Sequence, residues 1–203
     1  VSFYNQTKDI GIKPTPKICG VGLLKDYKNM ITMDLKKSNN ILLVIGKTEG
    51  HLNQSLFARN ILNEKNGPPP EINLFNEKNN GETLLKLIDK DFIKAAHDVS
   101  LGGIITAIAK MCIKGKKGVS LNKPNYLINT FEYFFGEDQG RYIVEIEKSN
   151  LKNVTGILEK NSVHYDKLGT VNENELIIDE KSKVTIDELR TSNTNWLTNY
   201  MSK

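Results

Sequence analysis

The chain has 203 residues, of which 38% are hydrophobic and 26% are charged, a balance typical of a folded globular protein with a substantial core. Its 28 basic and 24 acidic residues leave a net charge of only +4, spread along the chain, which argues against a nucleic-acid-binding protein. No apolar run has the length of a membrane span and the chain starts without a signal-peptide pattern, so we expect neither membrane insertion nor secretion.

The two cysteines, Cys19 and Cys112, lie far apart and outside any Cys/His cluster, which argues against a zinc site. Both have apolar neighbours, so we expect two reduced thiols in the core of a cytoplasmic protein. The chain opens with the apolar and aromatic stretch 1–4 and has no initiator methionine. We therefore expect a fragment of a longer polypeptide.

The first half of the chain begins with an extended connector, because Pro14 and Pro16 cannot take part in regular strand pairing. A continuous apolar run, ended by Gly46, is typical of a buried strand. Apolar residues at helical spacing follow, and Gly81 is expected to interrupt the second of two helices. In chain order we expect a connector at 1–17, strands at 18–24 and 41–45, helices at 53–64 and 72–88, and a strand at 93–97.

The second half of the chain begins with a strongly apolar helix, which Ser100 is expected to cap and Gly115 to stop. The clearest strand pattern alternates so that Tyr142, Val144 and Ile146 share one face. In chain order we expect a helix at 100–113, a strand at 119–121, an ambiguous segment at 126–135 with helix favoured, a strand at 141–147, a helix at 151–160, strands at 163–171 and 176–178, and a helix at 185–201. This mixture predicts an α+β fold, with one mixed sheet flanked by helices.

The first candidate site is the segment from His97 to Gly103, which joins an expected strand to an expected helix. Free backbone amides and the helix dipole at such a position attract phosphate, and Asp98 could hold magnesium through a carboxylate oxygen. The same residues could instead be structural, with Ser100 as the helix cap and Asp98 bound to turn amides. The residues alone favour this structural interpretation, and the Gly-Lys-Ser/Thr ending of a Walker motif is missing.

The second candidate site is the segment from Phe134 to Tyr142, whose polar part, Glu137 to Arg141, lies at the start of the clearest strand. It could bind a ligand or a partner, or it could be a surface turn with a local ion pair of little energetic weight. The residues alone leave these two interpretations even.

A third candidate is the opening stretch 1–7, which is rich in hydroxyl and amide groups but could equally be a strand that crosses a domain boundary. His51 and His164 have no carboxylate or cysteine at metal-ligand spacing, so we assign them no role.

Four motifs, in order, make the chain resemble the phosphoribosylformylglycinamidine synthase family, in the small form found in many bacteria. They are Val1-Ser2-Phe3-Tyr4-Asn5-Gln6-Thr7, then Ile12-Lys13-Pro14-Thr15-Pro16 with Gly20-Val21-Gly22, then His97-Asp98-Val99-Ser100-Leu101-Gly102-Gly103, and finally Phe135-Gly136-Glu137-Asp138-Gln139-Gly140-Arg141-Tyr142. Residues 51–55 and 67–70 also look like this family, and the resemblance covers the whole chain.

The resemblance implies a fold like the C-terminal domain of aminoimidazole ribonucleotide synthetase, over residues 18–203, after the tail of a preceding ATP-binding domain and a linker at 1–17. It implies a ligase of purine biosynthesis, which uses ATP and Mg²⁺ to convert formylglycinamide ribonucleotide and glutamine-derived ammonia into the amidine. The implied partners are this ribonucleotide, a glutaminase subunit and a small assembly subunit. Most ATP and Mg²⁺ ligands would lie in domains outside this chain.

The resemblance places no catalytic residue in this chain, so we expect the chain alone to be inactive. It implies that Ser2 contacts the substrate, and that Asp98 and Ser100 belong to an auxiliary nucleotide site where Asp98 also binds the metal. Leu101 stands where the family has an aspartate, so an anion such as sulfate is a safer expectation there than a magnesium-bridged nucleotide.

Two alternatives remain from the sequence. The first is a non-catalytic binding or assembly module of the same fold, which the absence of a Lys/His/Asp catalytic set would also explain. The second is a related synthetase of the same superfamily, against which the stretch 137–142 argues.

Overall fold

The computed structural model describes residues 6–11, 18–24, 26–126 and 129–202. The chain divides into two compact units, Val1–Met30 and Ile31–Lys203. In the smaller unit, strands β1 (Gln6–Thr7) and β2 (Ile10–Gly11) pair antiparallel, and a 3₁₀ turn, η1, follows at Tyr27–Asn29. Everything that forms the candidate site belongs to the larger unit.

The strand expected at 18–24 is wrong, because these residues form no strand and Val21 and Leu23 are 95% and 99% exposed. Apolar side chains alone do not make a strand, which needs a neighbour for its backbone hydrogen bonds. Cys19 is exposed in the same stretch, which corrects the expectation of a core thiol. Cys112 is buried as expected, and this burial raises its pKa to about 12.

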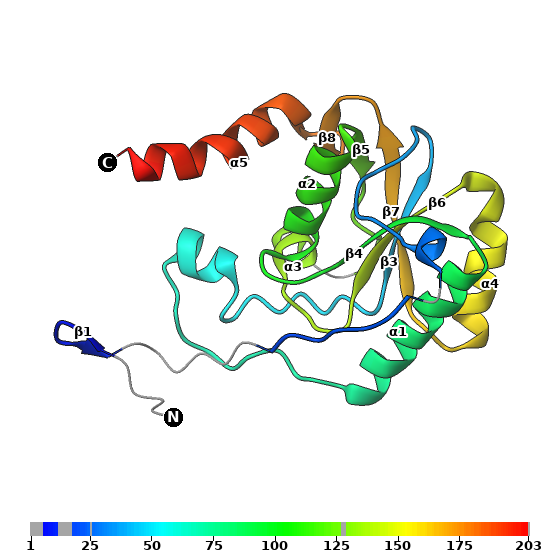
Figure 1. The fold of residues 1–203 in the computed structure, drawn as a ribbon, viewed down its shortest axis with the longest axis horizontal. Helices are drawn as coiled ribbons and strands as arrows, with labels where there is room; N and C mark the ends of the chain where they lie inside the picture. Colours follow the sequence, from blue (N-terminus) through cyan, green and yellow to red (C-terminus); the bar gives the residue numbers. More distant parts are fainter. Residues whose placement is uncertain (1–5, 12–17, 25, 127–128, 203) are drawn as a thin grey trace. The chain divides into compact units, whose positions relative to one another are not determined.

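The larger unit is built on a seven-stranded sheet (Figure 1) with the order β4-β6-β3-β7-β5-β8-β9. All neighbouring pairs are antiparallel except β5 and β8, so the expected mixed sheet is confirmed. The last strand is the one not expected from the sequence. The strands are β3 (Ile41–Ile45), β4 (Ile93–Asp98), β5 (Gly118–Leu121), β6 (Tyr142–Ile146), β7 (Tyr165–Asn172), β8 (Glu175–Ile178) and β9 (Ser182–Thr185).

The helices follow the expected order with two corrections. The helix through Gly81 is not interrupted, because one glycine costs only about 1 kcal/mol and the buried Leu84 and Leu87 offset this. The helix expected at 53–64 shrinks to a short helical turn that ends at the left-handed Asn63. The elements are η2 (Ala58–Leu62), α1 (Leu74–Asp89), α2 (Gly103–Gly115), α3 (Thr130–Phe135), η3 (Lys148–Asn150), α4 (Leu151–Lys160) and α5 (Ile186–Met201).

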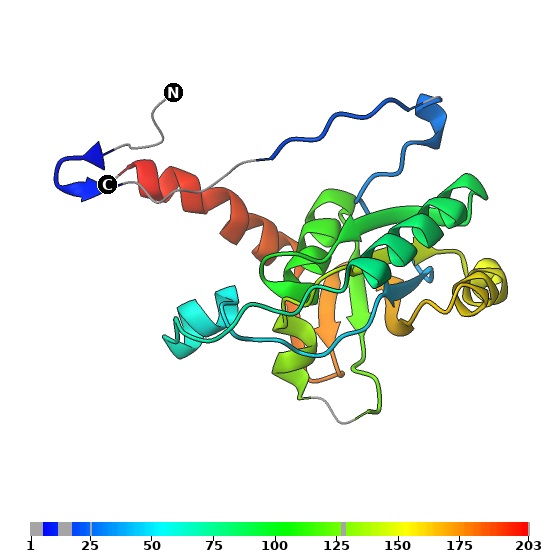
Figure 2. The same ribbon diagram turned by 90° about the horizontal axis from the view of Figure 1, so that it is seen from below.

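Both faces of the sheet are covered, which explains why β3 is apolar at every position. Leu42 and Val44 pack in a core with α2 and α3, whereas alternate residues of β3 pack in a second core with α1 and α4. Figure 2 shows α5 extending away from the sheet, and among the described residues no helix is long and apolar enough to cross a membrane. The α+β fold expected from the sequence is confirmed.

The strand register brings three distant loops to one end of the sheet. Tyr142, the first residue of β6, pairs with Ile45 at the end of β3 and with Asp98 at the end of β4. The loops that follow β3 and β4 therefore meet the turn that precedes β6. This meeting point contains both candidate segments of the larger unit.

Candidate functional site

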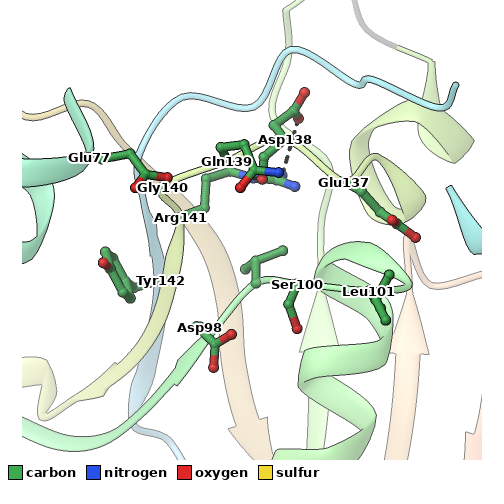
Figure 3. A pocket seen from close by; sticks show the side chains of 11 residues that line it. Glu77, Asp98, Ser100, Leu101, Glu137, Asp138, Gln139, Gly140, Arg141 and Tyr142 are labelled. Atoms are coloured by element: carbon green, nitrogen blue, oxygen red, sulfur yellow. Dashed lines mark hydrogen bonds and ion pairs between the residues drawn. The ribbon is translucent and has the colours of Figure 1, made fainter. Parts of the chain in front are cut away.

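A cavity of 370 Å³ lies where these loops meet. Its walls come from Asp98 at the end of β4, from Ser100 and Leu101 in the turn that follows, from residues 137–142, and from Glu77 on α1. Figure 3 shows Asp98 and Ser100 next to each other, opposite an edge formed by Glu77 and the turn before β6. The fold thus brings together the two polar residues singled out from the first motif.

The carboxylate of Asp98 is accessible to a bound molecule or ion. Its side chain is 64% exposed, and its Oδ1 lies 3.0 Å from Nδ1 of the nearly buried His97. Burial raises the pKa of Tyr142, and the negative charges of Glu77 and Asp98 raise it further, so both carboxylates act on the same phenol. The cavity is therefore acidic on this side and favours a cation.

Ser100 does not cap α2, which corrects the expectation from the sequence. The N-cap is Gly102, whose φ of 84° is left-handed and whose missing Cβ would stand 2.2 Å from Oγ1 of Thr106. The backbone N–H of Gly102 donates to Oε1 of Glu137 at 2.8 Å, and the N–H of Gly103 donates to the Ser100 carbonyl at 3.0 Å. A carboxylate of the chain itself thus stands at the start of this helix.

This carboxylate changes what the helix start can bind. The helix dipole and free amides favour one negative charge at this position, and Glu137 already provides it. A phosphate placed beside Glu137 would meet a like charge, and Glu77 and Asp98 add two more in the same cavity. The arrangement therefore disfavours a free anion such as sulfate, contrary to the expectation from the sequence.

Asp138 ties the loop after β3 to the turn before β6. The residue is only 7% exposed, and its carboxylate accepts three backbone hydrogen bonds. The donors are the N–H groups of Glu49 at 3.1 Å, Gly50 at 3.0 Å and His51 at 3.0 Å. Glu137 adds a second tie, since its Oε1 also accepts from the N–H of Leu56 at 2.7 Å.

Arg141 lies beneath this turn and is only 1% exposed. It donates to the carbonyl of Gly136 at 2.7 Å and to Oγ1 of Thr48 at 3.0 Å, and it lies 3.5 Å from Oδ2 of Asp138. Burial lowers its pKa, and the negative charge of Asp138 opposes that shift. The interpretation of this motif as a surface turn with a weak ion pair is wrong, because the pair is buried.

Gln139 differs from the rest of its motif. Its side chain is exposed and, among the residues that the structure describes, it has no hydrogen-bond partner. It lines the cavity with Asp98 and also a second cavity of 890 Å³, where His51 and His164 lie. The Gln139 side chain is therefore available to a ligand.

Other expectations from the sequence have mixed outcomes. Ser2 lies outside the described residues, so its place in a substrate site stays a prediction. Leu101 is 59% exposed on the cavity wall. The described part of the chain contains no group of three or more potential metal-binding side chains.

The sequence did not point to Glu77 as a site residue, because only the packing of α1 brings it to the cavity.

The family model and the known proteins that match this chain agree with each other. Residues 37–180 match the family model described as AIR synthase related protein, C-terminal domain. The chain is 79% identical over 201 residues to phosphoribosylformylglycinamidine synthase subunit PurL of Pelagibacter ubique, covering 99% of the chain and 28% of that protein. The PurL subunit of Bartonella henselae is 38% identical over 203 residues, covering 100% of the chain and 28% of that protein.

Two solved structures share the fold. PurL of Thermotoga maritima complexed with FGAR superposes with a TM-score of 0.68 at 16% identity, covering 80% of the chain and 30% of that protein. The same protein complexed with ATP gives a TM-score of 0.61 at 16% identity, covering 80% and 27%. The chain thus spans less than a third of the length of the relatives that it matches.

Proposed function

Because the chain belongs to the family of AIR synthase related proteins, whose C-terminal domain it matches, we propose that it supplies the C-terminal part of a phosphoribosylformylglycinamidine synthase. The observation that carries this proposal is the 79% identity over nearly the whole chain to a PurL subunit. The reaction joins ammonia to formylglycinamide ribonucleotide. ATP phosphorylates the amide oxygen, ammonia attacks the activated carbon, and phosphate leaves to give the amidine.

In this proposal the chain has a supporting role in a larger assembly. ATP, Mg²⁺ and the ribonucleotide bind mainly to parts of the polypeptide outside this chain, and residues 1–17 are the tail of the preceding ATP-binding domain. A glutaminase subunit supplies the ammonia, and a small third subunit helps to assemble the complex. Relatives more than three times as long as this chain support this division of labour.

The isolated chain is expected to fold but not to form the amidine. Its two apolar cores lie within residues 31–203, so thermal unfolding should be cooperative. The measurement is ATP-dependent amidine formation from the ribonucleotide and ammonia, with a full-length PurL subunit as the positive control. Turnover by this chain alone would contradict the proposal.

We further propose that Asp98 and Ser100 hold an auxiliary nucleotide, with magnesium bound to Asp98. The exposed carboxylate, the neighbouring hydroxyl and the cavity that they share support this. Because Glu137 occupies the helix start, the phosphates bind through the metal and not directly to the amides. Leu101 contributes no oxygen ligand, so a metal on Asp98 would need water for its remaining ligands.

Ser2 is expected to contribute to substrate affinity in the full-length enzyme. Its hydroxyl can both donate and accept a hydrogen bond. Losing one such bond costs about 0.5–1.5 kcal/mol, so Ser2→Ala should raise the KM for the ribonucleotide roughly two- to twelvefold. Steady-state kinetics measure this, with Ser149→Ala as a control on the surface turn η3. An unchanged KM removes Ser2 from the substrate site.

A further inference from the structure

Helix α5 begins against the core of the larger unit and then extends away from the sheet (Figure 2). A capping box formed by Thr185 and Glu188 fixes its first turn, and Ile186 and Leu189 pack in the core that contains α2. From residue 191 to residue 201, every residue of the helix is exposed. We call these residues the outer half of α5, and at a rise of about 1.5 Å per residue they form a segment about 16 Å long.

The outer half of α5 has a composition that gives a helix little support in water. Seven of its eleven residues are threonine, asparagine or serine, which form helices less readily than alanine, leucine or lysine. None of the eleven is charged, so no ion pair along this half stabilises it. Helical segments of this length depend mainly on the packing of one face against another surface. The outer half therefore requires a surface that covers it.

One face of the outer half is suited to such packing. Leu189, Asn193, Trp196 and Tyr200 follow at spacings of three to four residues, so the face that is partly buried at Leu189 continues along the helix. The rings of Trp196 and Tyr200 stack with their centroids 5.4 Å apart and their planes at 10°, although both residues are mostly exposed. Such an ordered aromatic pair is typical of the anchors at the centre of protein interfaces.

The surface that covers this face is expected to be apolar and uncharged. Leu197 and Met201 are 58% and 73% exposed beside the aromatic pair and extend its apolar area. The whole chain is 26% charged, yet the outer half offers no cation for a phosphate or an anionic lipid headgroup. Apolar contact without charge is characteristic of permanent interfaces within one assembly.

The exposed area argues against a second copy of this chain as the partner. Each of the four apolar side chains offers at most about 150–250 Å², and they are already partly covered, so together they supply roughly 600 Å². A stable interface between separate molecules needs about 800 Å² from each partner. A surface on the same polypeptide needs less, because the covalent connection keeps it at a high effective concentration. The relatives have more than twice as much polypeptide outside the matched region as within it.

We propose that the outer half of α5 is an intramolecular docking face, which an apolar, uncharged surface of the remaining synthase polypeptide covers through Trp196 and Tyr200. This inference rests on the proposed function, in which the chain is the C-terminal part of a longer enzyme. The docked helix fixes the position of this region relative to the rest of the polypeptide. In the isolated chain the same residues lack this partner, and their helical hydrogen bonds open readily.

Hydrogen exchange followed by mass spectrometry tests the docking face in two proteins. One is the 203-residue chain alone, and the other is a hybrid in which this chain replaces the matching 28% of the Pelagibacter ubique subunit. Peptides from residues 191–201 should exchange at least about tenfold more slowly in the hybrid. Replacing both Trp196 and Tyr200 with alanine should remove this protection. Thr198→Ala, two residues from Trp196 and nearly on the opposite side of the helix, should retain it.

The isolated chain also tests the proposal by itself. Slow exchange of residues 191–201 at all concentrations would show that the helix needs no partner, and protection that is lost on dilution would identify a second copy as the partner. Both results overturn the docking face. Peptides from β3 and β6 lie in the core and should exchange slowly in every variant, which confirms that each one is folded.

Amidine formation by the same hybrid separates this inference from the proposed function. A hybrid that forms the amidine without protecting residues 191–201 would overturn the docking face and leave the proposed function standing. A hybrid that protects these residues but forms no amidine would support the docking face and contradict the proposed function.

Discussion

Replacing Asp138 with alanine is expected to lower the free energy of unfolding by about 3–5 kcal/mol, the usual cost of removing one partner of a buried ion pair. The change leaves the Arg141 guanidinium, 1% exposed, without its carboxylate. It also leaves the N–H groups of Glu49, Gly50 and His51 without their acceptor. Urea unfolding followed by circular dichroism measures the loss.

Asp98→Ala is the matched control for this stability measurement. It removes the same side chain from the same cavity, but this one is 64% exposed and pairs only with His97 in the described structure. Its expected effect is about 0.5–1.5 kcal/mol, because the nearly buried His97 loses one hydrogen bond. Equal losses for the two variants would show that Asp138 does not hold the loops together.

Asp98→Asn is expected to reduce magnesium-dependent ADP binding by at least about tenfold, the second large effect. The amide keeps the size of the side chain but removes the anionic oxygen that a hard cation requires. ADP without magnesium should bind weakly to both proteins, because Glu137 already places a carboxylate at the start of α2. Equilibrium dialysis with magnesium or with EDTA measures these four affinities.

A second exposed aspartate provides the control for this binding experiment. Asp91 pairs with Lys94 at 3.1 Å and lines neither cavity, so Asp91→Asn should leave ADP binding unchanged. ADP binding that is equally tight in EDTA would contradict the metal-bridged site. Loss of magnesium dependence in both aspartate variants would point to a general effect of charge.

Local patterns predicted the elements whose side chains face a core. The run 41–45 is apolar throughout because helices cover both faces of the sheet, and it forms β3 within those bounds. Tyr142, Val144 and Ile146 share one face, as expected from their alternation, and this face packs in the core with α1 and α4. Residues 151–160 form α4 without any shift in its ends. In each case the sequence pattern of a short segment follows directly from which of its own side chains are buried.

Features that depend on distant contacts could not be predicted. Ser100 is a good cap by residue type, but the N–H of Gly102 at the start of α2 donates to Glu137, which lies 35 residues after Gly102 in the chain. Arg141 has the composition of a surface residue and is nonetheless buried, because the loop after β3 folds over it. Glu77 reaches the cavity only through the packing of α1.

The most direct test of the proposed function is a domain exchange in the full-length PurL subunit of Pelagibacter ubique. This chain replaces the matching 28% of that protein, and ATP-dependent amidine formation is measured with the ribonucleotide and ammonia. The unmodified subunit and a version without this region are the controls. We predict that the hybrid forms the amidine at a rate comparable to the unmodified subunit. A hybrid that folds and binds ATP but forms no amidine would contradict the proposal.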